Sequence, residues 1–138
     1  MPGRIVFIDD ERKIPEYYTA RLGKENFEVV RCQGPDEAID YLKRNPGPAQ
    51  AFILDIMMPS GEAYKDCDTD DDTNTGLLLY AYIRKQCPTT PIVILTNRQI
   101  SELPQEQADD PNKLVLWKPD CTPSELAEQV KSLISSGS

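Results

Sequence analysis

The chain has 138 residues, of which 39% are hydrophobic and 28% are charged. This length suits a single domain with one hydrophobic core, so we expect residues 1–138 to form one domain without a separate output domain. The longest apolar runs are too short to cross a bilayer, and the first residues lack the long apolar core of a signal peptide. We therefore expect a cytoplasmic protein that does not bind membranes.

The charge and the residue types narrow the chemistry further. The 23 acidic and 15 basic residues give a net charge of −8, which opposes binding to nucleic acids. The chain has no histidine, which excludes Ser-His-Asp hydrolysis, histidine-ligated zinc and phosphohistidine carriage. Its four cysteines form no CxxC pair and are expected to be reduced. The remaining chemistry must use carboxylates, hydroxyls and lysine.

Five short runs rich in branched apolar residues alternate with segments of helical periodicity, which is the pattern of repeated βα units. The strands are expected at Arg4–Ile8 and at residues 27–31, 51–55, 91–96 and 114–117. Their nearly continuous apolar character is typical of parallel strands that helices cover on both faces. The sequence therefore predicts an α/β fold.

The helices are expected in the gaps between these strands. They are placed at about residues 14–22, 34–45, 75–85, 100–107 and 123–134. Pro15 suits a first helical turn, Gly23 is expected to follow the end of the first helix, and Thr122 is the expected cap of the last helix. A flexible tail is expected at about residues 135–138.

A polar stretch at about residues 60–74, rich in aspartate, interrupts the alternation of expected strands and helices. Part of it resembles the start of an EF-hand loop, but Thr73 replaces the required glycine and Leu79 the required glutamate, so we reject a calcium site. Two interpretations stay open: a solvated, mobile acidic loop, and a lid or recognition surface for a basic partner. Our hypothesis is that this insertion gates or guides the docking of a partner.

The residues that end each strand carry the most information, because open α/β sheets bind ligands outside the carboxyl ends of their strands. The first strand ends in Asp9 and Asp10, the third in Asp55, the fourth in Thr96 and the fifth in Lys118. We expect these side chains to converge on one edge of the sheet. Three carboxylates repel one another unless a cation lies between them, and such hard oxygen ligands suit magnesium or manganese.

A carboxylate beside such a cation can attack a phosphoryl donor, while a nearby ammonium neutralises charge on the phosphoryl oxygens. Asp55 is the expected acceptor, Lys118 the expected ammonium, and the Thr96 hydroxyl can donate a hydrogen bond to the new phosphoryl group. Each residue alone has an ordinary explanation; Asp9 and Asp10, for example, could cap the first helix. Their joint order at successive strand ends favours the functional interpretation.

Four segments of the chain resemble motifs of response-regulator receiver domains of two-component signalling, as in chemotaxis regulators. They are VFIDDE at residues 6–11, ILDIMMP at 53–59, IVILT at 92–96 and LWKP at 116–119. The resemblance covers nearly the whole chain and implies a flavodoxin-like (βα)5 fold, a doubly wound parallel sheet of order 2-1-3-4-5. It also implies that Asp10 and Asp55 bind magnesium directly, that Asp9 assists through water, and that the backbone carbonyl of Met57 is a further ligand.

The same resemblance implies a phosphorylation switch rather than a turnover enzyme. Asp55 would take the phosphoryl group from a phosphohistidine on a separate histidine kinase or phosphotransfer protein, and Lys118 and Thr96 would contact it. The domain would catalyse only its own phosphorylation and dephosphorylation, and an unknown downstream protein would read the altered surface. The alternative partner is a second copy of the chain, which would form a homodimer through the helices at residues 100–107 and 123–134. The Lys118-Pro119 bond is often cis in this family.

Apart from the insertion, two residues depart from the family pattern. Asn97 follows Thr96, where a small residue is usual, and Val115 stands where an aromatic residue is common. Trp117 lies on the same side of its strand as Val115 but is not a clear substitute. A receiver-like interaction module that works without phosphorylation is therefore the runner-up. A haloacid-dehalogenase-like phosphatase is disfavoured, because the first strand is not followed by Asp-x-Asp.

Overall fold

The computed structural model describes residues 3–11, 13–45, 49–69, 72, 74–97 and 110–136. The strands are β1 (Arg4–Ile8), β2 (Glu28–Cys32), β3 (Ala51–Leu54), β4 (Ile92–Thr96) and β5 (Lys113–Trp117). The helices are α1 (Ile14–Lys24), α2 (Pro35–Arg44), α3 (Thr75–Gln86) and α4 (Pro123–Ser136), and a 3-10 turn, η3 (Lys118–Asp120), follows β5. The strands form one parallel sheet of order β2-β1-β3-β4-β5, which confirms the predicted fold.

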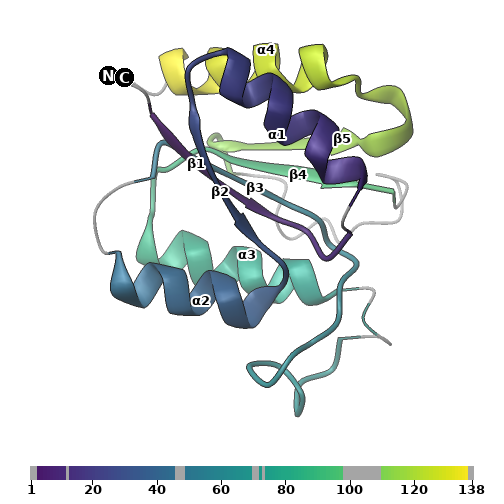
Figure 1. The fold of residues 1–138 in the computed structure, drawn as a ribbon. Helices are drawn as coiled ribbons and strands as arrows, with labels where there is room; N and C mark the ends of the chain where they lie inside the picture. The colour runs from purple at the N-terminus through teal and green to yellow at the C-terminus, as the bar shows by residue number, and fades with distance from the viewer. Residues whose placement is uncertain are drawn as a thin grey trace.

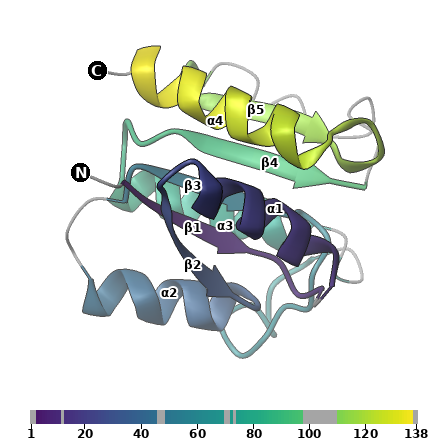
Figure 2. The same ribbon diagram turned by 45° about the horizontal axis from the view of Figure 1, so that its top comes forward.

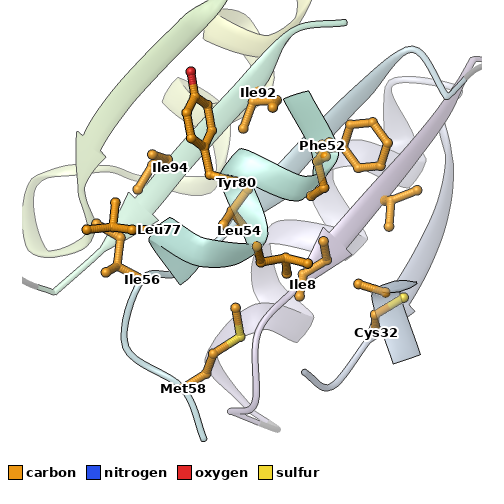
Figure 3. Close-up of a cluster of buried hydrophobic side chains, with 14 of the residues drawn as sticks. Ile8, Cys32, Phe52, Leu54, Ile56, Met58, Leu77, Tyr80, Ile92 and Ile94 are labelled. Atoms are coloured by element: carbon orange, nitrogen blue, oxygen red, sulfur yellow. The ribbon is translucent and has the colours of Figure 1, made fainter. Parts of the chain in front are cut away.

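The helices cover both faces of this sheet, with α1 and α4 on one face and α2 and α3 on the other (Figures 1 and 2). Successive strand residues point to opposite faces, so each strand feeds two clusters of buried side chains. Figure 3 shows the cluster under α2 and α3, to which β3 contributes Phe52 and Leu54 and α3 contributes Leu77 and Tyr80. Every residue of β3 and β4 is buried, as predicted for central strands covered on both sides.

The element bounds differ from the predicted ones by one or two residues. Helix α1 continues through Gly23, and Asn26 supplies the left-handed conformation after the helix end, with φ of 69°. Helix α4 extends to Ser136, and the predicted cap is confirmed, because the Glu125 N–H donates to the Thr122 hydroxyl at 3.2 Å. The helix predicted at residues 100–107 and the last two residues of the predicted tail lie outside the described residues.

The insertion at about residues 60–74 is attached to the first turn of α2. The Asp36 carboxylate accepts hydrogen bonds from the backbone N–H groups of Glu62 and Ala63, both at 2.8 Å. Gly61, with φ of +63°, makes the turn that lies against this carboxylate. Tyr64 packs against the α2–α3 cluster. The described part of the insertion therefore has a defined position, while its role stays a prediction.

A polar network fixes the start of β5 to α3. The Arg84 guanidinium donates to the Asp110 carboxylate at 2.8 Å, and the Tyr80 hydroxyl donates to the same carboxylate. Arg84 also donates to the backbone carbonyls of Cys87 and Thr90, at 2.8 and 2.7 Å. Burial alone would raise the pKa of Asp110, but hydrogen bonds from Tyr80, the backbone and Arg84 lower this pKa overall.

None of the described helices is both long and apolar enough to span a membrane.

Candidate functional site

Lys118 brings together the carboxyl ends of three strands. Its ammonium donates to Asp9 Oδ2 at 2.8 Å and to Asp55 Oδ2 at 3.2 Å, and Glu11 Oε2 lies 3.9 Å away. Asp9 follows β1, Asp55 follows β3, and Lys118 begins the turn after β5. The predicted convergence of these side chains on one edge of the sheet is therefore observed for Asp9, Asp55 and Lys118. The Lys118-Pro119 bond is trans, the usual X-Pro state, within η3.

The local sequence holds both carboxylates in matching ways. In each case the second carboxylate oxygen accepts a hydrogen bond from the backbone N–H two residues further along the chain. The Glu11 N–H donates to Asp9 Oδ1 at 3.0 Å, and the Met57 N–H donates to Asp55 Oδ1 at 3.2 Å. Each carboxylate is thus fixed at one oxygen by its own turn and at the other by Lys118.

Asp9, Asp55 and Lys118 are all buried, so water solvates their charges poorly. The exposed fractions of Asp9, Asp55 and Lys118 are 1%, 3% and 6%. Burial raises the pKa of Asp55, the charge of Asp9 raises it further, and Lys118 offsets only part of this. Burial opposes the charged form of Lys118, but Asp55, Asp9 and Glu11 raise its pKa overall. Lys118 therefore stays an ammonium between two carboxylates that gain from a positive charge.

The remaining predicted residues lie around this group. Asp10 is exposed, and partial desolvation together with the charge of Asp9 raises its pKa. Met57 follows Asp55 on the loop after β3, with 42% of its surface exposed. Thr96 is fully buried at the end of β4, in register with Trp117 of β5. Their predicted roles as ligands or phosphoryl contacts stay predictions.

The donor set at this edge fits a hard divalent cation, although its side chains are not drawn together around one point. Asp9, Asp10 and Asp55 supply carboxylate oxygens, and a cation would offset the burial and the charge of Asp9 that raise the pKa values of Asp10 and Asp55. Glu11 Oε2 is buried without a hydrogen-bond partner. Within the described ranges, no three carboxylate or thiol side chains are grouped closely enough to hold a metal ion. The chemistry of the donors therefore fits magnesium, with Lys118 as the positive charge present here.

The structure also accounts for two of the departures from the family pattern. Val115 packs against the α2–α3 cluster as a core residue. The indole N–H of Trp117 donates to the backbone carbonyl of Asn97 at 3.2 Å, which joins the residue after Thr96 to the residue before Lys118. Strand alternation predicts that Trp117 and Val115 lie on one side of the strand, but this hydrogen bond was not predictable from the sequence.

Two further residues at the site were missed from the sequence. The Arg31 guanidinium donates to the backbone carbonyls of Asp9 and Glu11, and Gly76 lies against the backbone of Asp55. A single strand arginine gives no sequence signal. A glycine in a first helical turn does give one, because glycine permits close backbone contact.

The chain matches the model of the response regulator receiver domain family over residues 5–131. This protein therefore belongs to that family and contains the receiver domain of a two-component response regulator. Such domains are signalling modules. Among curated proteins, it is similar to the response regulator MprA of Mycobacterium sp. (strain KMS), with 30% identity over 98 residues. That match covers 71% of this chain and 36% of the relative, so the chain matches about a third of the relative's length.

Solved structures share the fold. A response regulator receiver domain protein from Clostridium thermocellum superposes with a TM-score of 0.75 at 21% identity, covering 97% of this chain and 95% of the other. The chemotaxis response regulator CheY4 of Vibrio cholerae gives a TM-score of 0.73 at 22% identity, covering 96% and 99%. At these identities the similarity concerns the fold alone.

Proposed function

We propose that this receiver domain accepts a phosphoryl group on Asp55 from a phosphohistidine of another protein, in a magnesium-dependent reaction, and that the altered surface then binds a partner. The observation that supports this most strongly is the contact of the Lys118 ammonium with the buried carboxylates of Asp55 and Asp9. Because an ammonium already lies beside the proposed acceptor, it can stabilise the negative charge that phosphorylation adds.

In the proposed reaction, a carboxylate oxygen of Asp55 forms a bond to phosphorus while the bond from phosphorus to the imidazole nitrogen of the donor breaks. The imidazole leaves with the electron pair of that bond and is neutral or protonated according to its own pKa. The Met57 N–H holds Asp55 Oδ1. The Lys118 ammonium, which lies beside Asp55 Oδ2, would neutralise negative charge on the phosphoryl oxygens. Magnesium bound by Asp10, Asp55 and the Met57 carbonyl, with Asp9 assisting through water, would neutralise charge on the transferred group. Manganese would serve in the same way.

The change at Asp55 would pass to the surface through Thr96. Its hydroxyl would donate to the phosphoryl group, and the movement would displace Asn97, whose carbonyl is bonded to Trp117. Trp117 would therefore move together with Asn97. The family commonly has an aromatic residue at the position of Val115, and Trp117 would serve in its place. A histidine kinase or phosphotransfer protein is the proposed donor, and the downstream protein is not specified. Action in the cytoplasm is part of the same proposal.

The test is intact mass after incubation with acetyl phosphate and magnesium. The native chain should gain one phosphoryl group, while Asp55→Asn should gain none. Asp36→Asn, a matched change in α2, should behave as the native chain. Omission of magnesium should abolish the gain. No gain in the native chain, with magnesium binding shown separately, would favour the runner-up, a receiver-like module that binds its partner without phosphorylation.

The insertion is proposed to gate or guide partner docking. Its attachment to α2 through Asp36 places the exposed acidic residues Glu62, Asp66 and Asp68 in a defined region of the surface. A variant in which residues 60–74 are replaced by a short linker should be phosphorylated by acetyl phosphate at the native rate but more slowly by its kinase. Native rates with both donors and native partner binding would refute this role.

A further inference from the structure

Arg31 connects the edge strand β2 to the backbone of the acidic turn after β1. Its Nη2 atom donates to the Asp9 carbonyl at 3.1 Å and to the Glu11 carbonyl at 2.9 Å. The guanidinium carbon lies 5.7 Å from the centre of the Phe7 ring, and Phe7 is the residue in register with Arg31 across the β1–β2 pair. Stacking on Phe7 therefore orients the guanidinium toward the turn.

The turn receives little support from the helix that follows it. Helix α1 has Lys13 at its N-cap, with no side-chain capping hydrogen bond. The three consecutive acidic residues of the turn also repel one another and the nearby Asp55. On the strand side, the Asp9 N–H donates to the Cys32 carbonyl at 3.0 Å. Arg31 therefore holds the Asp9 carbonyl, and the Cys32 carbonyl at the end of β2 holds the Asp9 N–H.

A chain of contacts leads from Arg31 to the phosphorylation site. Arg31 holds the carbonyl of Glu11, the N–H of Glu11 donates to Asp9 Oδ1, and Asp9 Oδ2 accepts from Lys118. Lys118 in turn contacts Asp55. Displacement of the Glu11 backbone would therefore change the direction of the Asp9 carboxylate and the position of Lys118.

We propose that Arg31 is a positioning residue for the site: it fixes the acidic turn and thereby sets the affinity for the divalent cation. This rests on the proposed function, in which the same turn supplies cation ligands. In this proposal Arg31 does not contact the phosphoryl group or the cation itself. It holds the backbone of Asp9 and Glu11, on either side of the proposed ligand Asp10, as outer-shell partners of metal ligands do in general.

The variants are Arg31→Gln and Arg31→Lys, with Arg4→Gln as the matched control. Arg4 is on the same strand pair but near the other end of β1, where it bonds Tyr41 and Glu28. Magnesium affinity is measured by calorimetry, and phosphorylation by acetyl phosphate at low and at saturating magnesium. In the metal-free protein, hydrogen exchange of the Glu11 amide reports the turn directly.

Arg31→Gln should weaken magnesium binding about tenfold, the lower limit for loss of an outer-shell partner. It should slow phosphorylation at low magnesium much more than at saturating magnesium, and speed exchange of the Glu11 amide. Arg31→Lys should restore part of each effect, because an ammonium can donate to these carbonyls but lacks the planar fork that stacks on Phe7. Arg4→Gln should leave all three measurements near native values.

Unchanged magnesium affinity and unchanged Glu11 exchange in Arg31→Gln would overturn the proposal, as would an equal loss in Arg4→Gln. If Arg31→Gln does not fold, the proposal fails unless Arg31→Lys shows the partial loss of affinity. Failure of the proposed function gives a different result: the native chain itself would take no phosphoryl group. Exchange of Glu11 would then still decide whether Arg31 holds the turn.

Discussion

Gly76 lies so close to Asp55 that a β-carbon at position 76 would be 2.1 Å from the Asp55 carbonyl oxygen and 2.5 Å from the Ile56 Cα. The Gly76 N–H also donates to the Ile56 carbonyl at 2.7 Å. The first turn of α3 is thereby fixed against the backbone that carries the proposed phosphoryl acceptor. Because both clashes are with backbone atoms, a larger residue cannot be accommodated by a side-chain rotation.

Gly76→Ala should therefore lower the free energy of unfolding by about 2–3 kcal/mol, as overpacking of a tight contact does. Gly23→Ala is the matched control, because a β-carbon at Gly23 in α1 would have no atom within 4 Å. That change should stabilise the protein by roughly 0.5–1 kcal/mol, through the higher helix propensity of alanine. Urea unfolding measures both, and equal effects of the two variants would contradict the proposed contact.

Asp55→Asn should stabilise the metal-free protein. Burial raises the pKa of Asp55, so its charged form is disfavoured in the folded state at neutral pH. Removing the charge should raise the melting temperature by roughly 4 °C, which corresponds to about 1 kcal/mol in a domain of this size. Asp40→Asn, on the exposed face of α2, should change it little.

The stabilisation by Asp55→Asn should depend on pH. As the pH falls through the raised pKa of Asp55, the native chain takes up a proton there and loses the cost of the buried charge. The melting temperatures of the native and Asp55→Asn proteins should therefore converge between neutral pH and about pH 4, the ordinary carboxyl range. A difference that is constant across this range would contradict the assignment to Asp55.

Lys118→Met should be strongly destabilising, because it leaves Asp9 and Asp55 buried without their shared ammonium. Loss of one partner of a buried ion pair costs about 3 kcal/mol. Lys118→Met combined with Asp55→Asn should recover part of the loss, since one fewer carboxylate is then unpaired. A double-mutant cycle from urea unfolding gives the coupling energy, and additivity within about 0.5 kcal/mol would show that the two residues do not interact.

Asp36→Ala should release the insertion from α2 without affecting phosphorylation by acetyl phosphate. Asp36 accepts the backbone N–H groups of Glu62 and Ala63, so its loss should speed trypsin cleavage after the exposed Lys65 several-fold. Asp40→Ala, one helical turn further along α2, is the control and should leave cleavage unchanged. Equal cleavage rates in both variants would show that Asp36 does not hold the insertion.

The sequence was sufficient to predict the fold because the apolar runs, and the turn residues that separate them, define the βα units. The parallel topology then brings the carboxyl ends of the strands together. Asp9, Asp55 and Lys118 were predictable for this reason: each follows a strand directly. Arg31 was not, since its importance lies in contacts with the backbone of a distant segment, and such contacts leave no pattern of residue types. Gly76 does give a signal, as a glycine in a first helical turn, but the sequence does not say which backbone it contacts. The position of the insertion depends likewise on Asp36, which in sequence is an ordinary first-turn acid of a helix.

The chain leaves the sheet at Asn97 and returns at Asp110, and side chains from other elements hold both points. Trp117 donates to the Asn97 carbonyl, and Arg84 and Tyr80 hold the Asp110 carboxylate. The two ends of the connection between β4 and β5 are therefore held by contacts that do not involve residues 98–109. A reporter peptide or a new recognition sequence could be grafted between these two fixed points while Lys118 keeps its place beside Asp55.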